Sequence, residues 1–266
     1  MKILILANKD LASNFAINCL LPDLKDHKIC LFLSAKVGGI KKANGLKALK
    51  FFEQDLFTQV ISPNLTPPNA RESDCMSFEQ MDAVLCQPHI DLNDINNQDS
   101  INNIQKMAPD LIISIRYGVI LKKPIIAIPK HGVINLHSGL LPNYRGVMAT
   151  FWALLNGEKT IGTTLHYIDD ASIDTGSVID QTELTVDPSR SYLWHVLSLY
   201  KSGSLTIIEA VIKITNKQNI KHTNQTGTGH YYTFPNELDL QNYMNKGLIL
   251  IDENEYLNFI KSHYLN

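Results

Sequence analysis

The stretch Lys2-Ile3-Leu4-Ile5-Leu6-Ala7 is apolar at every position after its lysine, and a polar turn, Asn8-Lys9-Asp10, follows it. Residues 11–21 then carry apolar side chains at helical spacing. A strand that is apolar throughout is buried on both faces, which is typical of parallel sheets covered by helices. The beginning of the chain therefore predicts an α/β fold with a doubly covered sheet.

The same strand-and-helix alternation continues along the chain and extends this prediction. Further strands are expected at residues 29–33, 111–115, 133–137, 163–168 and 177–186, and further helices at 41–53, 78–86, 147–156, 191–215 and 253–262. The last two strands, joined by an Asp/Gly-rich connection, are expected to form a hairpin or a near-hairpin. Residues 87–100 are rich in Asn and Asp and are expected to form a loop.

Composition excludes several classes of protein. The chain has 266 residues, of which 44% are hydrophobic and 19% charged, so it can bury a core and is not disordered. Lys and Arg number 24 against 26 Asp and Glu, a balance that argues against a protein that wraps nucleic acid. Four widely spaced cysteines indicate reduced thiols. The apolar run that opens the chain is too short for a signal peptide or a membrane span, so we expect a soluble, cytoplasmic protein without a membrane partner.

The segment with most chemical content is Asn135-Leu136-His137 and the loop that follows it. Because strand side chains alternate, Asn135 and His137 project from the same face at the carboxyl end of a predicted strand. An amide donor beside an imidazole suits chemistry at a carbonyl, where the amide stabilises an oxyanion and the imidazole moves a proton. Asp174, in a later loop, is a candidate carboxylate to set the protonation of His137. The alternative is that His137 only caps a strand end.

A set of motifs, taken together, resembles the folate-dependent formyltransferase family, which includes glycinamide ribonucleotide, methionyl-tRNA and sugar-nucleotide formyltransferases. The detailed match covers residues 109–186, and Gly139 stands where relatives carry Ser. The resemblance rests on Asn135-Leu136-His137, Leu140-Leu141-Pro142, Arg145-Gly146, Gly162-Thr163-Thr164-Leu165-His166 and Ile173-Asp174-Thr175-Gly176.

This resemblance implies a Rossmann-like formyltransferase sheet, N10-formyltetrahydrofolate as co-substrate and no metal. It places Asn135, His137 and Asp174 at the family's catalytic positions. It also implies a folate pocket formed by Tyr117, Gly118, Val119, Leu121 and Asp170. Two alternatives remain open: Val119 and Leu121 can simply pack the core, and Asp169 and Asp170 can lie in a solvated loop. His166 is interpreted as a structural residue of its strand.

The C-terminal third bears on the acceptor amine. We expect residues 1–190 to form the catalytic domain and residues 191–266 a helix and β-hairpin extension that makes a homodimer. From Arg190 onward the chain has seven Lys or Arg and six Asp or Glu, and such a near-neutral balance argues against tRNA binding. The element Tyr231-Tyr232-Thr233-Phe234-Pro235 resembles the C-terminal region of sugar-nucleotide N-formyltransferases.

By this resemblance the chain is expected to formylate a nucleotide-linked amino sugar, such as dTDP-4-amino-4,6-dideoxyglucose, for O-antigen and lipopolysaccharide synthesis. Lys9 and Arg145 are candidates to contact the diphosphate, and Tyr231 or Tyr232 to stack on the base. Each has a plainer alternative, since Lys9 can be a solvated turn residue and either tyrosine can pack in a core or an interface. Methionyl-tRNA formyltransferase, formyltetrahydrofolate hydrolase and a non-catalytic folate or nucleotide-binding module are the other functions considered.

Overall fold

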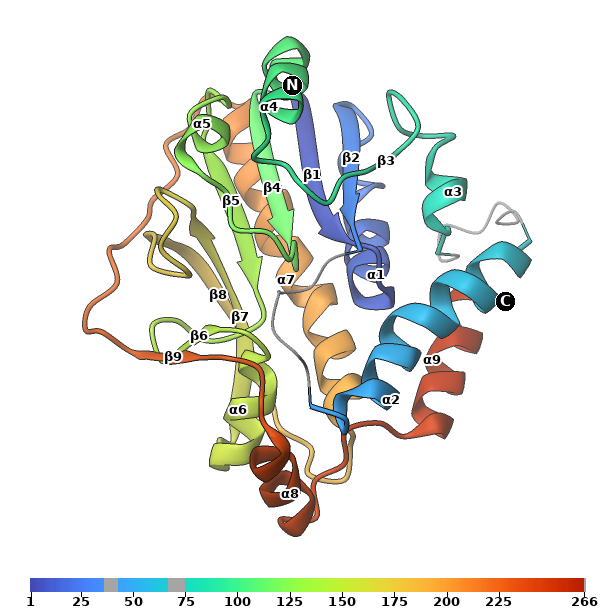
Figure 1. Cartoon of the computed structure of the whole chain (residues 1–266). Helices are drawn as coiled ribbons and strands as arrows, with labels where there is room; N and C mark the ends of the chain where they lie inside the picture. The colour runs from blue at the N-terminus through green and yellow to red at the C-terminus, as the bar shows by residue number, and fades with distance from the viewer. Residues whose placement is uncertain (36–42, 67–74, 266) are drawn as a thin grey trace.

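The computed structural model describes residues 1–35, 43–66 and 75–265. A seven-stranded sheet crosses the molecule, with helices on both sides and a two-stranded sheet beside it (Figure 1). The strands are β1 Lys2–Asn8, β2 Lys28–Ser34, β3 Ile90–Asp91, β4 Leu111–Ile115, β5 Val133–His137, β6 Tyr144–Gly146, β7 Thr160–Tyr167, β8 Val178–Thr185 and β9 His230–Tyr232.

The helices differ widely in length. The α-helices are α1 Leu11–Leu20, α2 Leu46–Lys50, α3 Phe78–Met81, α4 Gln98–Met107, α5 Lys123–Ile126, α6 Ala149–Asn156, α7 Tyr192–Thr215, α8 Glu237–Asn245 and α9 Glu253–Tyr264. Helix α2 continues without a break into two π-helical turns, η1 Phe51–Asp55 and η2 Phe57–Ile61, and a short 3-10 turn, η3 Ser62–Asn64.

The order of the strands places the carboxyl ends of three of them side by side. The sheet runs β3-β2-β1-β4-β5-β7-β8, with parallel pairs from β3 to β5 and antiparallel pairs from β5 through β7 to β8. This confirms the predicted Rossmann-like α/β fold and the antiparallel pair near residues 163–186. Ligands of open parallel sheets bind beyond the carboxyl ends of the strands, so the edge where β1, β4 and β5 end is where a site is expected.

Alternating side chains of β1 supply two separate cores, one on each face of the sheet. Ile3 and Ile5 belong to the cluster that packs α1 and α7, whereas Leu4 and Leu6 belong to the cluster that includes residues of α4 and α5. All four side chains are fully buried. The apolar run that opens the chain therefore encodes a central strand covered on both faces.

Helix α7 is packed inside the molecule. Its apolar residues Leu193, Val196 and Leu199 are buried, and the helix lies against α1, β7 and β8 of the same chain. Residues on both sides of the expected domain boundary near 190 thus share one core cluster. The apolar residues of this helix are largely covered within one chain, and the expected homodimer stays a prediction. Among the described residues, no helix is long and apolar enough to span a membrane.

Three helices, α4, α5 and α8, and two short strands, β3 and β6, lie outside the sequence prediction. The stretch expected to be a loop, 87–100, contains Asn97, whose side chain accepts a hydrogen bond from the Ser100 amide and so caps α4. The predicted helix 78–86 is much shorter, ending at Met81, and α8 was not predicted. Residues 41 and 42 of the predicted helix 41–53 lie outside the described residues; that helix begins at Leu46.

The predicted C-terminal β-hairpin is wrong for the described residues of this region. Its strand β9 pairs in parallel with β6, from the loop that follows β5, with Arg145 in register with Tyr231. This parallel pairing depends on Gly146 of β6. Gly146 has a φ of 95°, and an added Cβ there would overlap the Tyr232 carbonyl oxygen of β9. Only a glycine lets β9 approach β6 this closely.

Candidate active site

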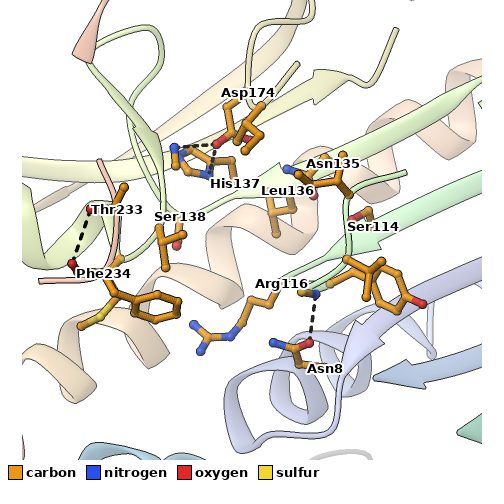
Figure 2. Close-up of a pocket in the computed structure, with 18 of the residues that line it drawn as sticks. Asn8, Ser114, Arg116, Asn135, Leu136, His137, Ser138, Asp174, Thr233 and Phe234 are labelled. Atoms are coloured by element: carbon orange, nitrogen blue, oxygen red, sulfur yellow. Dashed lines mark hydrogen bonds and ion pairs between the residues drawn. The ribbon is translucent and has the colours of Figure 1, made fainter. Parts of the chain in front are cut away.

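A cavity of about 480 Å³ opens at the edge where β1, β4 and β5 end (Figure 2). Asn8 reaches it from the end of β1, Arg116 from just beyond β4, and His137 from the end of β5. Asp174 reaches it from the loop between β7 and β8. Its volume is in the range of small-molecule and cofactor sites. The sheet order therefore concentrates polar side chains from distant parts of the sequence at one pocket.

Four polar side chains form a connected cluster at one end of this cavity. Asn135 of β5 and His166 of β7 are in register across the antiparallel pair, and their Nδ2 and Nε2 atoms lie 3.1 Å apart. The Nε2 of His166 is also 3.4 Å from Oδ1 of Asp174. The other carboxylate oxygen, Oδ2, is 3.5 Å from Nδ1 of His137. The structure thus brings together the three residues predicted as catalytic and adds His166 to them.

His137 is held between a carbonyl and a carboxylate. Its Nε2 lies 2.6 Å from the carbonyl oxygen of Tyr144, which can only accept, so Nε2 carries a hydrogen and donates it. Its Nδ1 lies 3.5 Å from Oδ2 of the Asp174 carboxylate. The ring is therefore oriented on both sides, with Nδ1 facing a negative charge.

Asp174 is held as a buried carboxylate. Its side chain is 10% exposed, and Oδ2 accepts a hydrogen bond of 2.8 Å from the Gly146 amide. Burial alone would raise the pKa of Asp174, but the charge of His137, the hydrogen bond from His166 and the Gly146 amide outweigh it. Together they lower the pKa from 3.8 to about 2. Asp174 therefore stays ionised wherever the protein is folded near neutral pH.

This lowered pKa predicts a pH-dependent contribution to stability. A carboxylate whose pKa is lowered by folding stabilises the folded state above its unfolded pKa, and loses that effect as the pH falls through the folded value. For Asp174 the window runs from 3.8 down to about 2, and the contribution is about 2 kcal/mol. Urea unfolding of the wild type and Asp174→Asn should therefore show a stability difference that shrinks as the pH is lowered through this window. A difference independent of pH there would contradict the role given to His137 and His166.

The comparison with known proteins agrees with this geometry. The family described as formyl transferase matches residues 59–195, which is more than half of the chain and includes the whole cluster. The chain belongs to the formyl transferase family. A curated relative, the methionyl-tRNA formyltransferase of Thermodesulfovibrio yellowstonii, is 38% identical over 143 residues. That match covers 54% of this chain and 44% of the relative, so the chain matches less than half of that relative's length.

Solved formyltransferase structures share the fold over a larger part of the chain. A sugar N-formyltransferase from Shewanella sp FDAARGOS_354 superimposes with a TM-score of 0.57 at 15% identity, covering 88% of this chain and 77% of that one. WlaRD, a sugar 3N-formyl transferase crystallised in the presence of dTDP and 5-N-formyl-THF, has a TM-score of 0.57 at 19% identity, covering 88% and 70%. At such low identities these structures establish the fold.

All five residues predicted to hold the folate line the cavity: Tyr117, Gly118, Val119, Leu121 and Asp170. The backbone of this loop is fixed by neighbouring strands and loops. Asn8 accepts from the Gly118 amide at 3.1 Å, and the Tyr117 hydroxyl donates to the Leu92 carbonyl at 3.1 Å. Leu121 is buried and Val119 only partly so, so the core-packing alternative holds for Leu121 in addition to its place in the lining. This loop therefore presents side chains to the cavity from a backbone that is held in place.

Arg116 lines the cavity and begins the segment predicted to form the folate pocket, but sequence reasoning gave its side chain no role. Its guanidinium lies 3.1 Å from Asp10 and 3.1 Å from Glu53, and Asp10 also caps α1 through the Ser13 amide. Burial alone would lower the pKa of Arg116, but Asp10 and the other nearby acids outweigh it and raise the pKa. Two carboxylates neutralise this cation. Arg116 therefore anchors the η1 turn over the cavity, and its charge is already paired.

The four residues predicted to bind the acceptor differ in their position relative to the cavity. Tyr231 lines the cavity and is 50% exposed. Arg145 does not line the cavity; it forms no ion pair with any described residue, and its Nε is buried without a hydrogen-bond partner. Lys9 lies outside the lining and pairs with Asp91 at 3.1 Å, which favours the plainer alternative for this lysine.

Tyr232 is committed to internal packing. Its ring stacks on Tyr144 at 5.6 Å and on Trp152 at 5.0 Å, and its hydroxyl accepts from Asn156. Both ring faces are therefore occupied by the same chain, and Tyr232 does not line the cavity. The structure disagrees with Tyr232 as a base-stacking residue and leaves Tyr231 as the candidate.

His166 and Gly146 are the site residues that sequence reasoning missed. His166 donates through Nδ1 to the Tyr167 carbonyl at 2.8 Å, which directs Nε2 toward Asn135 and Asp174. Its interpretation as a purely structural strand residue overlooks this contact. The available signal was the period of two: His166 stands on the antiparallel neighbour of the strand that carries Asn135, on the side that faces the same cavity.

Proposed function

We propose that this chain transfers the formyl group of N10-formyltetrahydrofolate to the primary amine of a nucleotide-linked amino sugar. The observation that carries the formyl-transfer step is the convergence of Asn135, His137 and Asp174 at one end of the cavity. Beside them lies the loop that fits the folate head. Membership of the formyl transferase family supports the same reaction.

The amide and the imidazole act on the tetrahedral intermediate. The neutral amine attacks the formyl carbon and the carbonyl electrons move to oxygen. The carbonyl then re-forms as the bond from carbon to N10 breaks, while the attacking nitrogen loses a proton and N10 gains one. The side-chain amide of Asn135 lines the cavity and can donate to the oxyanion. His137 supplies a positive charge beside it. Because both ring nitrogens of His137 are engaged, a proton transfer by this ring requires it to release the Tyr144 carbonyl.

The acceptor is inferred from the open side of the cavity. Tyr231 offers a half-exposed ring for a nucleobase, and Arg145, its neighbour in register, has a guanidinium that no described carboxylate neutralises. A diphosphate passing from the amine to the base would meet that guanidinium. The near-neutral C-terminal third and the sugar N-formyltransferase neighbours support this acceptor class over tRNA. On this proposal the enzyme works in the cytoplasm, in O-antigen or lipopolysaccharide synthesis.

Methionyl-tRNA is the second candidate acceptor, because the curated relative from Thermodesulfovibrio yellowstonii is a methionyl-tRNA formyltransferase. The two are separated by incubating the enzyme with N10-formyltetrahydrofolate and either a panel of nucleotide-linked amino sugars or charged initiator tRNA. A formyl mass increment on a sugar nucleotide supports the proposal. Formylation of the tRNA alone replaces it with the second candidate, and release of formate without an acceptor indicates a hydrolase.

Removal of the Tyr231 ring tests the base contact. Stacking of a base on an aromatic ring contributes on the order of 1–3 kcal/mol, so Tyr231→Ala should weaken sugar-nucleotide affinity by about tenfold or more. Tyr231→Phe keeps the ring and should bind nearly as the wild type does. Isothermal titration with the nucleotide sugar and, separately, with 5-formyltetrahydrofolate measures both affinities. Equal loss for sugar and folate would show that Tyr231 shapes the whole cavity and is not a base contact.

A further inference from the structure

The segment between α7 and α8, residues 216–236, passes the β7–β8 loop, which carries Asp174, and the loop that follows β5, which contains β6 (Figure 1). At its start, Thr223 and Val178 exchange two backbone hydrogen bonds of 2.8 Å at the base of the β7–β8 loop. At its end, β9 pairs with β6, and the Val147 amide donates to the Tyr232 carbonyl at 2.9 Å. We call residues 220–234 the strap. The strap is thus fastened to both loops.

Between these two attachments, Gln225 reaches back to the backbone of the catalytic loop. Its side-chain amide donates to the Asp174 carbonyl at 3.0 Å and to the Gly176 carbonyl at 2.8 Å. Gln225 is half-buried, while Asn224 and Thr226 on either side of it are exposed. Both amide hydrogens of one side chain are therefore spent on the turn that presents the carboxylate.

The turn that Gln225 holds has a backbone that needs such support. Asp174 has a φ of 54°, in the left-handed region, and an added Cβ at Gly176 would overlap the Tyr167 carbonyl oxygen. A non-glycine residue in this region persists when its surroundings hold it there. The side chain of Asp174 depends on the same geometry, because its oxygens must meet His137 and the Gly146 amide at once.

We infer that Gln225 is a positioning residue for the reaction: it fixes the Asp174 turn so that the carboxylate meets His137. This inference rests on the proposed formyl transfer. Gln225 itself does not line the cavity, and its side chain donates to the backbone of Asp174 and Gly176, so it acts through that backbone. The strap therefore serves the catalytic site as well as any acceptor that Tyr231 contacts.

Substitutions that change the hydrogen bonding of residue 225 test this role. Gln225→Glu places carboxylate oxygens against two carbonyl oxygens, and Gln225→Ala removes the contact. Because small misplacements of a catalytic group have large kinetic effects, both should lower kcat by roughly 10- to 100-fold. The KM for N10-formyltetrahydrofolate should stay within about twofold, since Gln225 does not contact residues 117–121 of the predicted folate pocket. Gln225→Lys keeps a hydrogen-bond donor on a side chain of similar length. It should therefore retain much more of the wild-type kcat than Gln225→Glu or Gln225→Ala.

The matched control is Gln241→Ala, on the exposed face of α8, whose side chain donates only to Asn245. It should leave kcat and KM unchanged. Hydrogen exchange gives a readout independent of turnover: in Gln225→Glu, but not in Gln241→Ala, exchange should increase at residues 174–176 and at the Gly146 amide. Wild-type kcat in Gln225→Glu, or unchanged exchange at these sites, would overturn the inference. A wild-type enzyme that formylates no amine would instead refute the proposed function, while the exchange measurement still decides the role of Gln225.

Discussion

Replacement of Asn135 by alanine is expected to reduce turnover by roughly 10²- to 10³-fold while leaving folate binding largely intact. The amide of Asn135 acts on a negative charge that exists only in the transition state, so its loss affects kcat far more than KM. The amide is directed into the cavity by its contact with His166 at 3.1 Å. Single-turnover formyl transfer and titration with 5-formyltetrahydrofolate measure the two effects separately.

The variants His137→Asn and Asp174→Asn are expected to be at least as damaging, and the three effects should not add. His137 and Asp174 face each other, and His166 joins Asn135 to Asp174, so the cluster works as one unit. The double variant of Asn135 and Asp174 should therefore lose little more than the worse single variant. Near wild-type turnover in any single variant would remove that residue from the mechanism.

The predicted sheet and the observed sheet agree because burial on both faces leaves a local signal. Residues 111–115 and 133–137 were predicted as strands from short, mostly apolar runs, and β4 and β5 have these same bounds. Short elements that depend on tertiary contacts left no such signal. Strand β9 exists because Gly146 lets it approach β6, and α8 begins where Asn236 caps it within a polar stretch.

Some residues of the candidate site could likewise be predicted from the sequence, and others could not. Asn135, His137 and Asp174 were found because a motif and a strand period pointed to them, and the structure places them together. Charge and aromaticity alone were weaker guides, as the ion pair of Lys9 and the internal stack of Tyr232 demonstrate. A lysine or a tyrosine has many possible partners, and which one it meets depends on the folded chain.

Substitution of Gly146 by alanine is expected to cause a loss of turnover as large as that of Asp174→Asn. Its φ of 95° disfavours any side chain, and an added Cβ would overlap the Tyr232 carbonyl oxygen and lie 3.0 Å from the Tyr231 ring. Strand β9 must then move away from β6. The amide of Gly146 donates to Asp174 at 2.8 Å, so the same shift should break this hydrogen bond to the catalytic carboxylate.

Gly247→Ala is the matched control, because Gly247 also has a positive φ, 75°, but an added Cβ there meets no atom within 4 Å. It carries backbone strain of about 1–2 kcal/mol without a clash, and should lower the melting temperature while leaving kcat unchanged. Kinetics and thermal unfolding of both variants separate strain from misplacement. If the two glycine variants lose activity in proportion to stability alone, the link from β9 through Gly146 to Asp174 is absent. If only Gly146→Ala loses kcat, one backbone position couples the C-terminal strand to the catalytic carboxylate.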